Sequence, residues 1–362
     1  MVTGVFLRLL FFTGPIGGDD SRYLHFAEQF VTLQSFDWVN HAAGRLVFLI
    51  LVGIPFVLGG HAVHAALANL LFSVITDLLA TYVAFRRFGW IGALIVAQVM
   101  ALCGTNIIYT SAVLPDTLLT LLMLLAVLAV ERALGSAEER ERWRWMVIAG
   151  LVTGAAYSCK DPGILLLVPV GAVVLLNQSQ LCARLSLLAT YAAGLGAFLI
   201  ADGLIYLAYT GDFFYRYSAI GAVHNVSIGA HGVGEFLAVA WDHILKAVSS
   251  WRLTGVSILA GFVLFPLALR HHPPLRLFAA TGLFVSLYLL FGSSSLSRLV
   301  PLPFQPRYFQ PIIPFVSLCL AGLLVPWLQV ARRYRAPVHL TLGLLVFITG
   351  MGPVQSQAGR MY

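Results

Sequence analysis

Charged side chains are scarce in this sequence. Only 10% of its 362 residues are Asp, Glu, Lys or Arg, whereas 59% are hydrophobic and the mean hydropathy is +0.88. A soluble domain carries a charge on roughly a quarter of its residues, so this chain lacks the groups needed to cover a water-facing surface. The scarcity excludes a soluble enzyme and leaves an integral membrane protein.

Cysteine is also rare. The four residues, Cys103, Cys159, Cys182 and Cys319, lie in or beside apolar runs without a CxxC motif or a metal-ligand spacing. This excludes a disulfide framework and favours small buried side chains. The formal charge of +7 does not indicate a nucleic-acid partner, because Lys and Arg collect in the cytoplasmic loops of membrane proteins.

The sequence is rich in apolar runs, and crossing a bilayer takes about 20 helical residues. These runs predict an all-α, polytopic transmembrane protein with about 11 spans, forming one domain over 1–362 without a C-terminal soluble domain. A first segment ends near Thr13 and a short apolar piece covers 46–60. The remaining predicted spans are 62–84, 91–110, 115–131, 145–158, 163–177, 185–209, 253–269, 275–292, 308–330 and 337–354.

The first segment is shorter than a span, and no small-residue cleavage site follows it. It therefore does not resemble a cleaved signal peptide, and we expect that the beginning of the first helix has been cut away.

Clusters of basic residues indicate which side of the membrane is cytoplasmic. They occur as "FRRFG" (85–89), "ERERWR" (139–144) and "ARRYR" (331–335), as expected for cytoplasmic loops. The other side has the two longest loops, 13–45 and 210–252, in which both signs of charge are mixed. We expect these loops to be periplasmic, or to face the cell exterior, and to hold the functional site, with His224 and His231 as candidates for substrate contact.

Two adjacent aspartates, Asp19 and Asp20, stand in the first of these loops. The segment 21–30 that follows places Tyr23 and Phe26 at helical spacing on one face, which predicts an amphipathic helix in the interface plane. Such a helix would hold the aspartates at a fixed depth, where a carboxylate can accept a proton or bind a divalent ion. The alternative is a solvated loop pair without a function.

Other charged residues stand at the ends of predicted spans. Asp116 follows a proline and opens an apolar span, where the helix macrodipole alone favours a carboxylate. Lys160 and Asp161 separate two short spans, and they either pair with each other or belong to a site. Arg307 and Tyr308 begin a span among four prolines. Both residues could anchor the protein at the membrane interface, or Arg307 could bind a phosphate.

Seven short motifs follow one another along the chain. They are "LRLLFF", "DDSRY", "AAGRLVF" around Arg45, "RRFG", "LPD", a Lys-x-Pro at Lys160 and "RYFQPIIP". Their order, from about Arg8 to Pro314, resembles the polyprenyl-phosphate-sugar-dependent glycosyltransferases of the GT-C superfamily. The most similar branch contains bacterial relatives of protein O-mannosyltransferases and the lipid A aminoarabinose transferase. That family has a long C-terminal periplasmic domain, which we expect this protein to lack.

The resemblance implies an inverting glycosyltransferase with interfacial periplasmic helices. It would move a sugar from a polyprenyl-phosphate donor to a hydroxyl of a glycan, lipid or protein acceptor, among membrane lipids at the outer face of the cytoplasmic membrane. The acceptor hydroxyl would attack the sugar through an oxocarbenium-like state, with inversion. No nucleotide-sugar motif is needed, in agreement with the lack of a soluble nucleotide-binding segment.

The resemblance also implies roles for particular residues. The leading aspartate, Asp19, would be the general base and Asp20 its orienting neighbour, although Asp-Glu is commoner than Asp-Asp in the family and the order within the pair stays open. The implied substrate-binding residues are Arg45, Tyr23, Asp116, Lys160, Arg307 and Tyr308. A divalent metal, if one is bound, would be held by Asp19, Asp20 or Asp116.

Three other functions compete with this interpretation. A transporter or flippase would place ionisable groups near the bilayer midplane in two repeated halves, whereas the charges here gather at one surface. A GT-C scaffold that has lost its chemistry would not need "DDSRY" intact. A lipid-linked polysaccharide ligase or polymerase would share the topology and differ in its donor.

The predicted topology can be tested by cysteine labelling. A cysteine introduced at Arg86 should be protected from an impermeant thiol reagent added to intact cells, and one introduced at His224 should be labelled. Labelling at both positions, or at Arg86 alone, would contradict the assignment of sides.

Overall fold

The computed structural model describes residues 2–12, 14–15, 18–33, 41–110, 112–177, 180–219, 233–249, 253–293, 302 and 305–331. Each regular element in these ranges is a helix, which confirms the all-α prediction. His224, His231 and the predicted span 337–354 lie outside the described residues.

The helices follow the apolar runs closely. In chain order they are α1 (Val2–Leu10), α2 (Asp19–Val31), α3 (Leu46–Val57), α4 (Ala62–Leu102), α5 (Gly104–Tyr109), α6 (Pro115–Gly135), α7 (Glu139–Cys159), the 3-10 helix η1 (Asp161–Leu166), α8 (Leu167–Asn177), α9 (Leu181–Thr210), α11 (Val233–Ser249), α12 (Leu253–His271), η2 (Pro273–Leu275), α13 (Arg276–Phe291), η3 (Pro306–Ile312) and α14 (Ile313–Ala331). Five helical segments in the described ranges are long and apolar enough to cross a membrane: Ala62–Leu102, Pro115–Gly135, Leu181–Thr210, Pro273–Phe291 and Arg307–Gln329.

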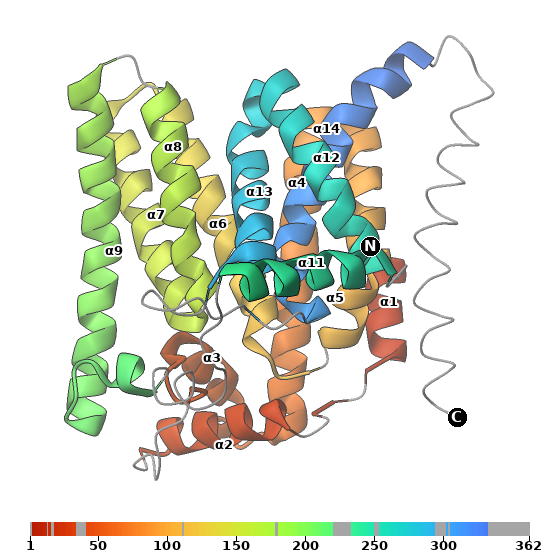
Figure 1. The fold of residues 1–362 in the computed structure, drawn as a ribbon. Coiled ribbons are helices and arrows are strands. Elements are labelled where there is room, and N and C mark those ends of the chain that lie inside the picture. The colour runs from red at the N-terminus through yellow and green to blue at the C-terminus, as the bar shows by residue number, and fades with distance from the viewer. Residues whose placement is uncertain are drawn as a thin grey trace.

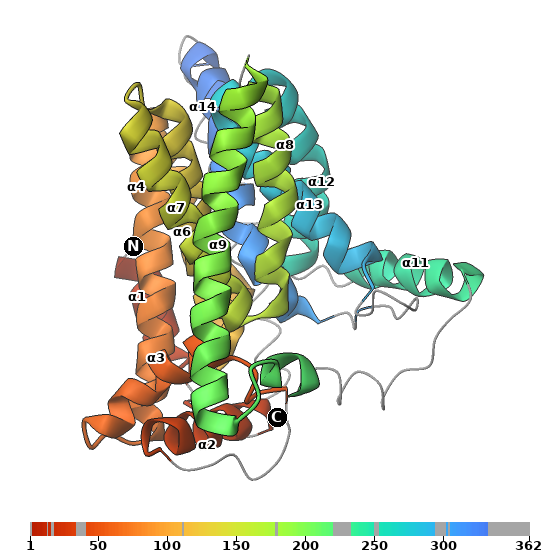
Figure 2. The same ribbon diagram turned by 90° about the vertical axis from the view of Figure 1, so that its left-hand side faces the viewer.

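The long helices stand side by side as a bundle, and α2 lies across one end of it, beside α3 (Figure 1). Helix α9 forms one edge of the bundle and runs along α7 and α8, as Figure 2 shows. Helix α7 also packs against α6. The first turn of α6 and the last turn of α7 thereby meet at the end of the bundle near α2 and α3.

Helix α4 is a hairpin of two helices. Gly89 interrupts it with φ 68° and ψ −163°, a left-handed conformation that glycine adopts without a steric penalty. The buried Arg8 pairs with Asp77 at 2.8 Å and also donates to the carbonyl of Met100 at 3.2 Å. A straight helix would separate Asp77 from Met100 by about 34 Å, so the two arms run antiparallel, as the separate predicted spans 62–84 and 91–110 require.

Helix α2 confirms the helix predicted over 21–30, but its surroundings differ from the prediction. Its apolar face is buried against protein: Phe26 and Ala27 have no exposed surface, and the Tyr23 ring meets Phe48 of α3 edge-on at 5.2 Å. The face expected to lie on the membrane surface therefore packs on α3. This contact fixes α2, and with it Asp19, relative to the bundle.

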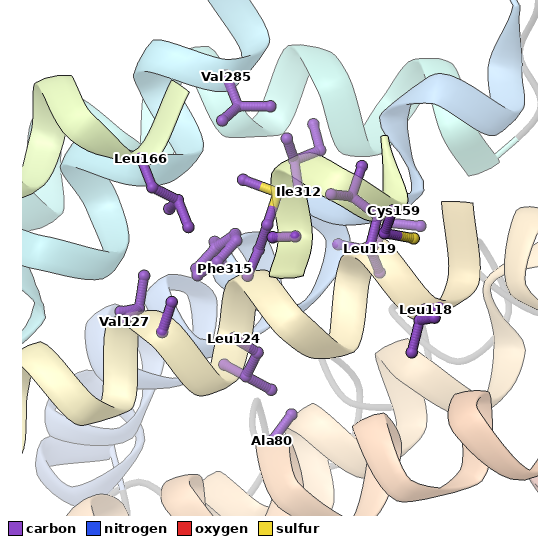
Figure 3. Close-up of a cluster of buried hydrophobic side chains, with 14 of the residues drawn as sticks. Ala80, Leu118, Leu119, Leu124, Val127, Cys159, Leu166, Val285, Ile312 and Phe315 are labelled. Carbon is purple, nitrogen blue, oxygen red and sulfur yellow. The ribbon is translucent and has the colours of Figure 1, made fainter. Parts of the chain in front are cut away.

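An apolar core lies at the junction of α6, α7 and α14 (Figure 3). Leu118 and Leu119 of α6 are packed there with Ile312 of η3 and Phe315 of α14, all nearly without exposed surface. Cys159, at the end of α7, donates a hydrogen bond to the carbonyl of Pro115 at 3.4 Å. The start of α6 and the end of α7 are thus held together at the edge of this core.

Three of the four cysteines are buried as predicted, but Cys182 is exposed. The prediction is wrong there because Cys182 lies in the first turn of α9, at the end of the bundle, where the neighbouring helices do not cover it.

Small residues allow α7 and α9 to approach closely. A Cβ atom at Gly150 would lie 2.1 Å from the carbonyl oxygen of Tyr191, and one at Gly194 would lie 2.3 Å from that of Val147. Close backbone contact at small residues is a common means of helix association in membranes.

We expect Gly150→Ala to destabilise the protein by about 1–3 kcal/mol, because the added methyl group forces the two backbones apart. Gly196→Ala in α9 is the matched control, since a Cβ there meets no atom within 4 Å and alanine favours the helix. Thermal unfolding of the purified protein in detergent measures both. Equal melting temperatures for the two variants would contradict the close packing of α7 on α9.

Candidate active site

A cavity of about 230 Å³ lies where α2, α6 and α7 meet. It is lined by Asp19, Tyr23, His41, Arg45, Leu114, Pro115, Asp116, Lys160, Asp161, Gln305, Arg307 and Tyr308. The structure thus brings together the predicted residues from five separate parts of the sequence. Asp20 is the exception: it is buried, with 3% of its surface exposed, and is not one of the lining residues.

Helix ends place the charged groups. Asp19 and Asp116 stand in the first turns of α2 and α6, and Arg45 directly precedes α3. Lys160 directly follows the last residue of α7. The macrodipole favours a carboxylate at a helix N-terminus and an ammonium at a C-terminus, so Asp19, Asp116 and Lys160 each occupy the favoured end.

Lys160 and Asp116 form a buried ion pair across the junction of α6 and α7. Their side chains are only 10% and 2% exposed, and the ammonium lies 4.0 Å from the centre of the Tyr308 ring. The alternative that Lys160 pairs with Asp161 is wrong. Asp161 instead accepts a hydrogen bond from Arg216 at 2.8 Å, because the two neighbours in sequence point to different partners.

Arg307 and Asp19 form the second ion pair of the cavity, at 2.8 Å. The Asp19 side chain is 35% exposed, so a molecule in the cavity can reach it. Partial burial acts to raise the pKa of the Asp19 carboxyl, but the hydrogen bond and charge of Arg307, with the charges of His41 and Arg22, outweigh it and hold that pKa below its ordinary value.

Arg45 differs from the other two cations of the cavity. Its guanidinium lies 5.3 Å from the centre of the Tyr23 ring, and among the described residues it forms no ion pair with a carboxylate. Arg45 therefore brings a positive charge into the cavity that a ligand can neutralise. The lining thus holds three cations, one of which has no carboxylate partner in the described part of the chain, and such a site is suited to an anion such as a phosphate.

Sequence reasoning missed His41 and Gln305, which also line the cavity. Neither belongs to a motif; the only available signal was their position shortly before Arg45 and Arg307 in the chain. It also missed Arg216, which belongs to none of the seven motifs.

The described part of the cavity contains no cluster of the usual metal-binding side chains. No group of three or more His, Cys, Asp or Glu side chains in the described ranges is arranged to hold one. Of the predicted ligands, Asp19 and Asp116 each have a cationic partner, and Asp20 does not line the cavity.

The ion pair of Asp19 makes a prediction about acid stability. Folding lowers the pKa of Asp19, so its contribution is complete above the ordinary aspartate pKa and is lost as the pH falls through the lowered value. At neutral pH we expect the wild-type protein to have a higher melting temperature than Asp19→Asn. This difference in melting temperature should shrink as the pH approaches about 3. Melting temperatures in detergent from pH 7 downward measure it. Glu28→Gln, an exposed carboxylate of the same helix, is the control, and a difference that is constant or grows in acid would contradict the ion pair.

Comparisons with known proteins bear on the family and the fold of the chain. The family model described as dolichyl-phosphate-mannose-protein mannosyltransferase matches residues 45–206. No curated protein sequence gives a significant match.

Solved structures match the fold over most of the chain. The apo structure of ArnT from Cupriavidus metallidurans has a TM-score of 0.63 and 16% identity over 89% of this chain and 57% of its own. ArnT bound to undecaprenyl phosphate has a TM-score of 0.56 and 16% identity over 89% and 58%. The arabinosyltransferase EmbB from Mycobacterium smegmatis has a TM-score of 0.54 and 14% identity over 89% and 30%.

The matched regions therefore cover between 30% and 58% of the length of these neighbours. Taken together, the family-model match and the structural matches show that this multi-pass membrane protein has the GT-C glycosyltransferase fold, and that it resembles the dolichyl-phosphate-mannose-protein mannosyltransferases and ArnT.

Proposed function

We propose that this protein is an inverting glycosyltransferase that moves a sugar from a polyprenyl-phosphate donor to a hydroxyl group of an acceptor. The single observation that carries the proposal is the composition of the cavity. It holds a carboxylate that a substrate can reach, Asp19, together with Arg45, Lys160 and Arg307. A base for a hydroxyl and cations for a phosphate are the two things that such a transfer needs.

The cations act on the donor's phosphate. As the bond between the sugar and the phosphate breaks, negative charge grows on the phosphate oxygens, and preorganised cations stabilise it. Arg45 offers its charge without first releasing a carboxylate of the described chain, and the planar fork of Arg307 can bind two phosphate oxygens at once. Lys160, held by Asp116 and the Tyr308 ring, supplies a fixed third charge.

Asp19 is the base rather than Asp20, because Asp19 faces the cavity and Asp20 is buried outside its lining. While Arg307 binds Asp19, the lowered pKa makes the carboxylate a weak base. A donor phosphate that draws Arg307 toward itself removes that partner, so the pKa of Asp19 rises when the donor is bound. The base is thereby strengthened in the complex that reacts.

The reaction follows with all atoms accounted for. Asp19 takes the proton of the acceptor hydroxyl, whose oxygen forms a bond to the anomeric carbon on the face opposite the phosphate. The bond between that carbon and the phosphate oxygen breaks, and the oxygen leaves with the electron pair as polyprenyl phosphate. The configuration at the anomeric carbon is inverted.

The site faces the periplasm or the cell exterior in this proposal. Asp116 begins α6 at the cavity, whereas Glu131, near the other end of α6, pairs with Arg87. Arg87 belongs to one of the basic clusters, which favour the cytoplasmic side, so the cavity lies at the opposite end. A lipid-linked donor in the cytoplasmic membrane presents its sugar there, and ArnT bound to undecaprenyl phosphate supports a polyprenyl-phosphate donor.

The test measures the lipid-linked sugar itself. Membranes of cells that lack this protein should accumulate one polyprenyl-phosphate sugar, which mass spectrometry identifies, and wild-type protein should return it to its basal level. Asp19→Asn should slow transfer by roughly 10²–10⁴, the contribution of a positioned acid–base group, and so should leave the sugar accumulated. Asp20→Asn should restore most of the transfer.

Membrane levels of both variants, measured by immunoblot, control for loss of folded protein. Equal transfer by Asp19→Asn and wild type in reconstituted vesicles would contradict the role of Asp19, and greater loss in Asp20→Asn would exchange the roles of the two residues. If no polyprenyl-phosphate sugar accumulates and none is consumed in vesicles, the proposed function is wrong.

A further inference from the structure

Arg216 binds the ends of three separate segments. Its guanidinium donates hydrogen bonds to the carbonyls of Gly44, Tyr157 and Ser158 and to the carboxylate of Asp161 at 2.8 Å. It also lies 4.4 Å from the centre of the Tyr157 ring. Such a set of bonds uses the planar, forked geometry of arginine, which a lysine ammonium cannot reproduce.

Arg216 does not contact the proposed substrate. It is not one of the residues that line the 230 Å³ cavity, and only 3% of its surface is exposed. It lines instead a neighbouring cavity of about 170 Å³ together with Asp202 and Tyr206. Asp161 lines the first cavity and pairs with Arg216, so the guanidinium lies directly behind the wall of the proposed site.

The groups that Arg216 binds are next to two of the three cations in the chain. Gly44 directly precedes Arg45, and Ser158 and Asp161 lie within two residues of Lys160. The carbonyls of Tyr157 and Ser158 end α7, where the last carbonyl groups of a helix lack partners inside it. Arg216 satisfies these carbonyls and ties them to the segment that carries Arg45.

We propose that Arg216 is a positioning residue that sets the separation of Arg45 and Lys160, and so determines how tightly the site binds a lipid-linked phosphate. The inference rests on the proposed function, because it names the phosphate as the group that the two cations share. Without Arg216 the carbonyl of Gly44 and the last carbonyls of α7 would lose the guanidinium that links them directly. A misplacement of about 1 Å can cost a catalytic site about two orders of magnitude in rate, and we expect the same displacement of two cations to weaken phosphate binding.

The experiment compares Arg216→Gln and Arg216→Lys with Arg87→Gln. Arg87 is a matched control at the other end of the bundle: it also binds a carboxylate, Glu131, and a carbonyl, that of Pro274, and lies 4.9 Å from the Phe278 ring. The probe is undecaprenyl phosphate, titrated against each purified protein in detergent. Melting temperatures are recorded in parallel.

We expect both Arg216 variants to bind undecaprenyl phosphate roughly tenfold to a hundredfold more weakly than wild type. Arg87→Gln should lower the melting temperature but leave this affinity unchanged. Wild-type affinity in Arg216→Lys would show that charge alone is needed, and an equal loss in Arg87→Gln would show that general destabilisation is the cause. Either result overturns the proposal.

Hydrogen exchange tests the positioning separately from the ligand. The amides of Leu49, Lys160 and Gly163 are hydrogen-bonded to backbone carbonyls, and Arg216→Gln should speed their exchange while Arg87→Gln should not. If wild-type protein binds no polyprenyl phosphate, the proposed function fails, and unchanged exchange in Arg216→Gln then overturns the positioning role as well. If exchange is faster both at the start of α3 and at the end of α7, Arg216 still positions these two segments, but the group that the site binds is not a polyprenyl phosphate.

Discussion

A charge buried between apolar helices has to be neutralised within the protein, because moving an ion out of water costs several kcal/mol. Asp116 and Lys160 are such charges, and they meet where α6 begins and α7 ends. Removing one partner of a buried pair costs about 3–5 kcal/mol. This requirement fixes the two helix ends against each other, and the cavity, its cations and the nearby core follow from that contact.

The same requirement limits what the cavity can bind. Arg307 is neutralised by Asp19, and Lys160 by Asp116, so a ligand gains affinity from these cations only by competing with a carboxylate. A phosphate can compete with a carboxylate for a guanidinium, because it too offers two negatively charged acceptor oxygens to the fork. A neutral ligand does not, which favours a donor that carries its own negative charge.

Much of the fold could be predicted from the sequence, because helices in an apolar environment need long apolar runs with charges or turns between them. The position of Asp116 at a helix start followed from the preceding proline alone. The partner of Lys160 could not be predicted: Asp161 is adjacent in sequence, yet Asp116, 44 residues away, is the partner, because helix packing decides which ends meet. Arg216 belongs to no motif, and its role exists only in three dimensions.

Two carboxylates of one cavity have opposite surroundings, and this difference separates their roles. Asp116 is 2% exposed and Asp19 is 35% exposed. A carboxylate that a substrate cannot reach can hold a lysine in place but cannot take a proton from an acceptor, whereas in the proposed reaction Asp19 takes that proton once Arg307 binds a phosphate. The adjacent aspartates differ in the same way, since the first turn of α2 directs Asp19 to the cavity and buries Asp20. Exposure, which a sequence does not record, therefore distinguishes the proposed base from Asp20 and Asp116, whereas the third carboxylate of the lining, Asp161, is 40% exposed and differs from Asp19 in its partner, Arg216.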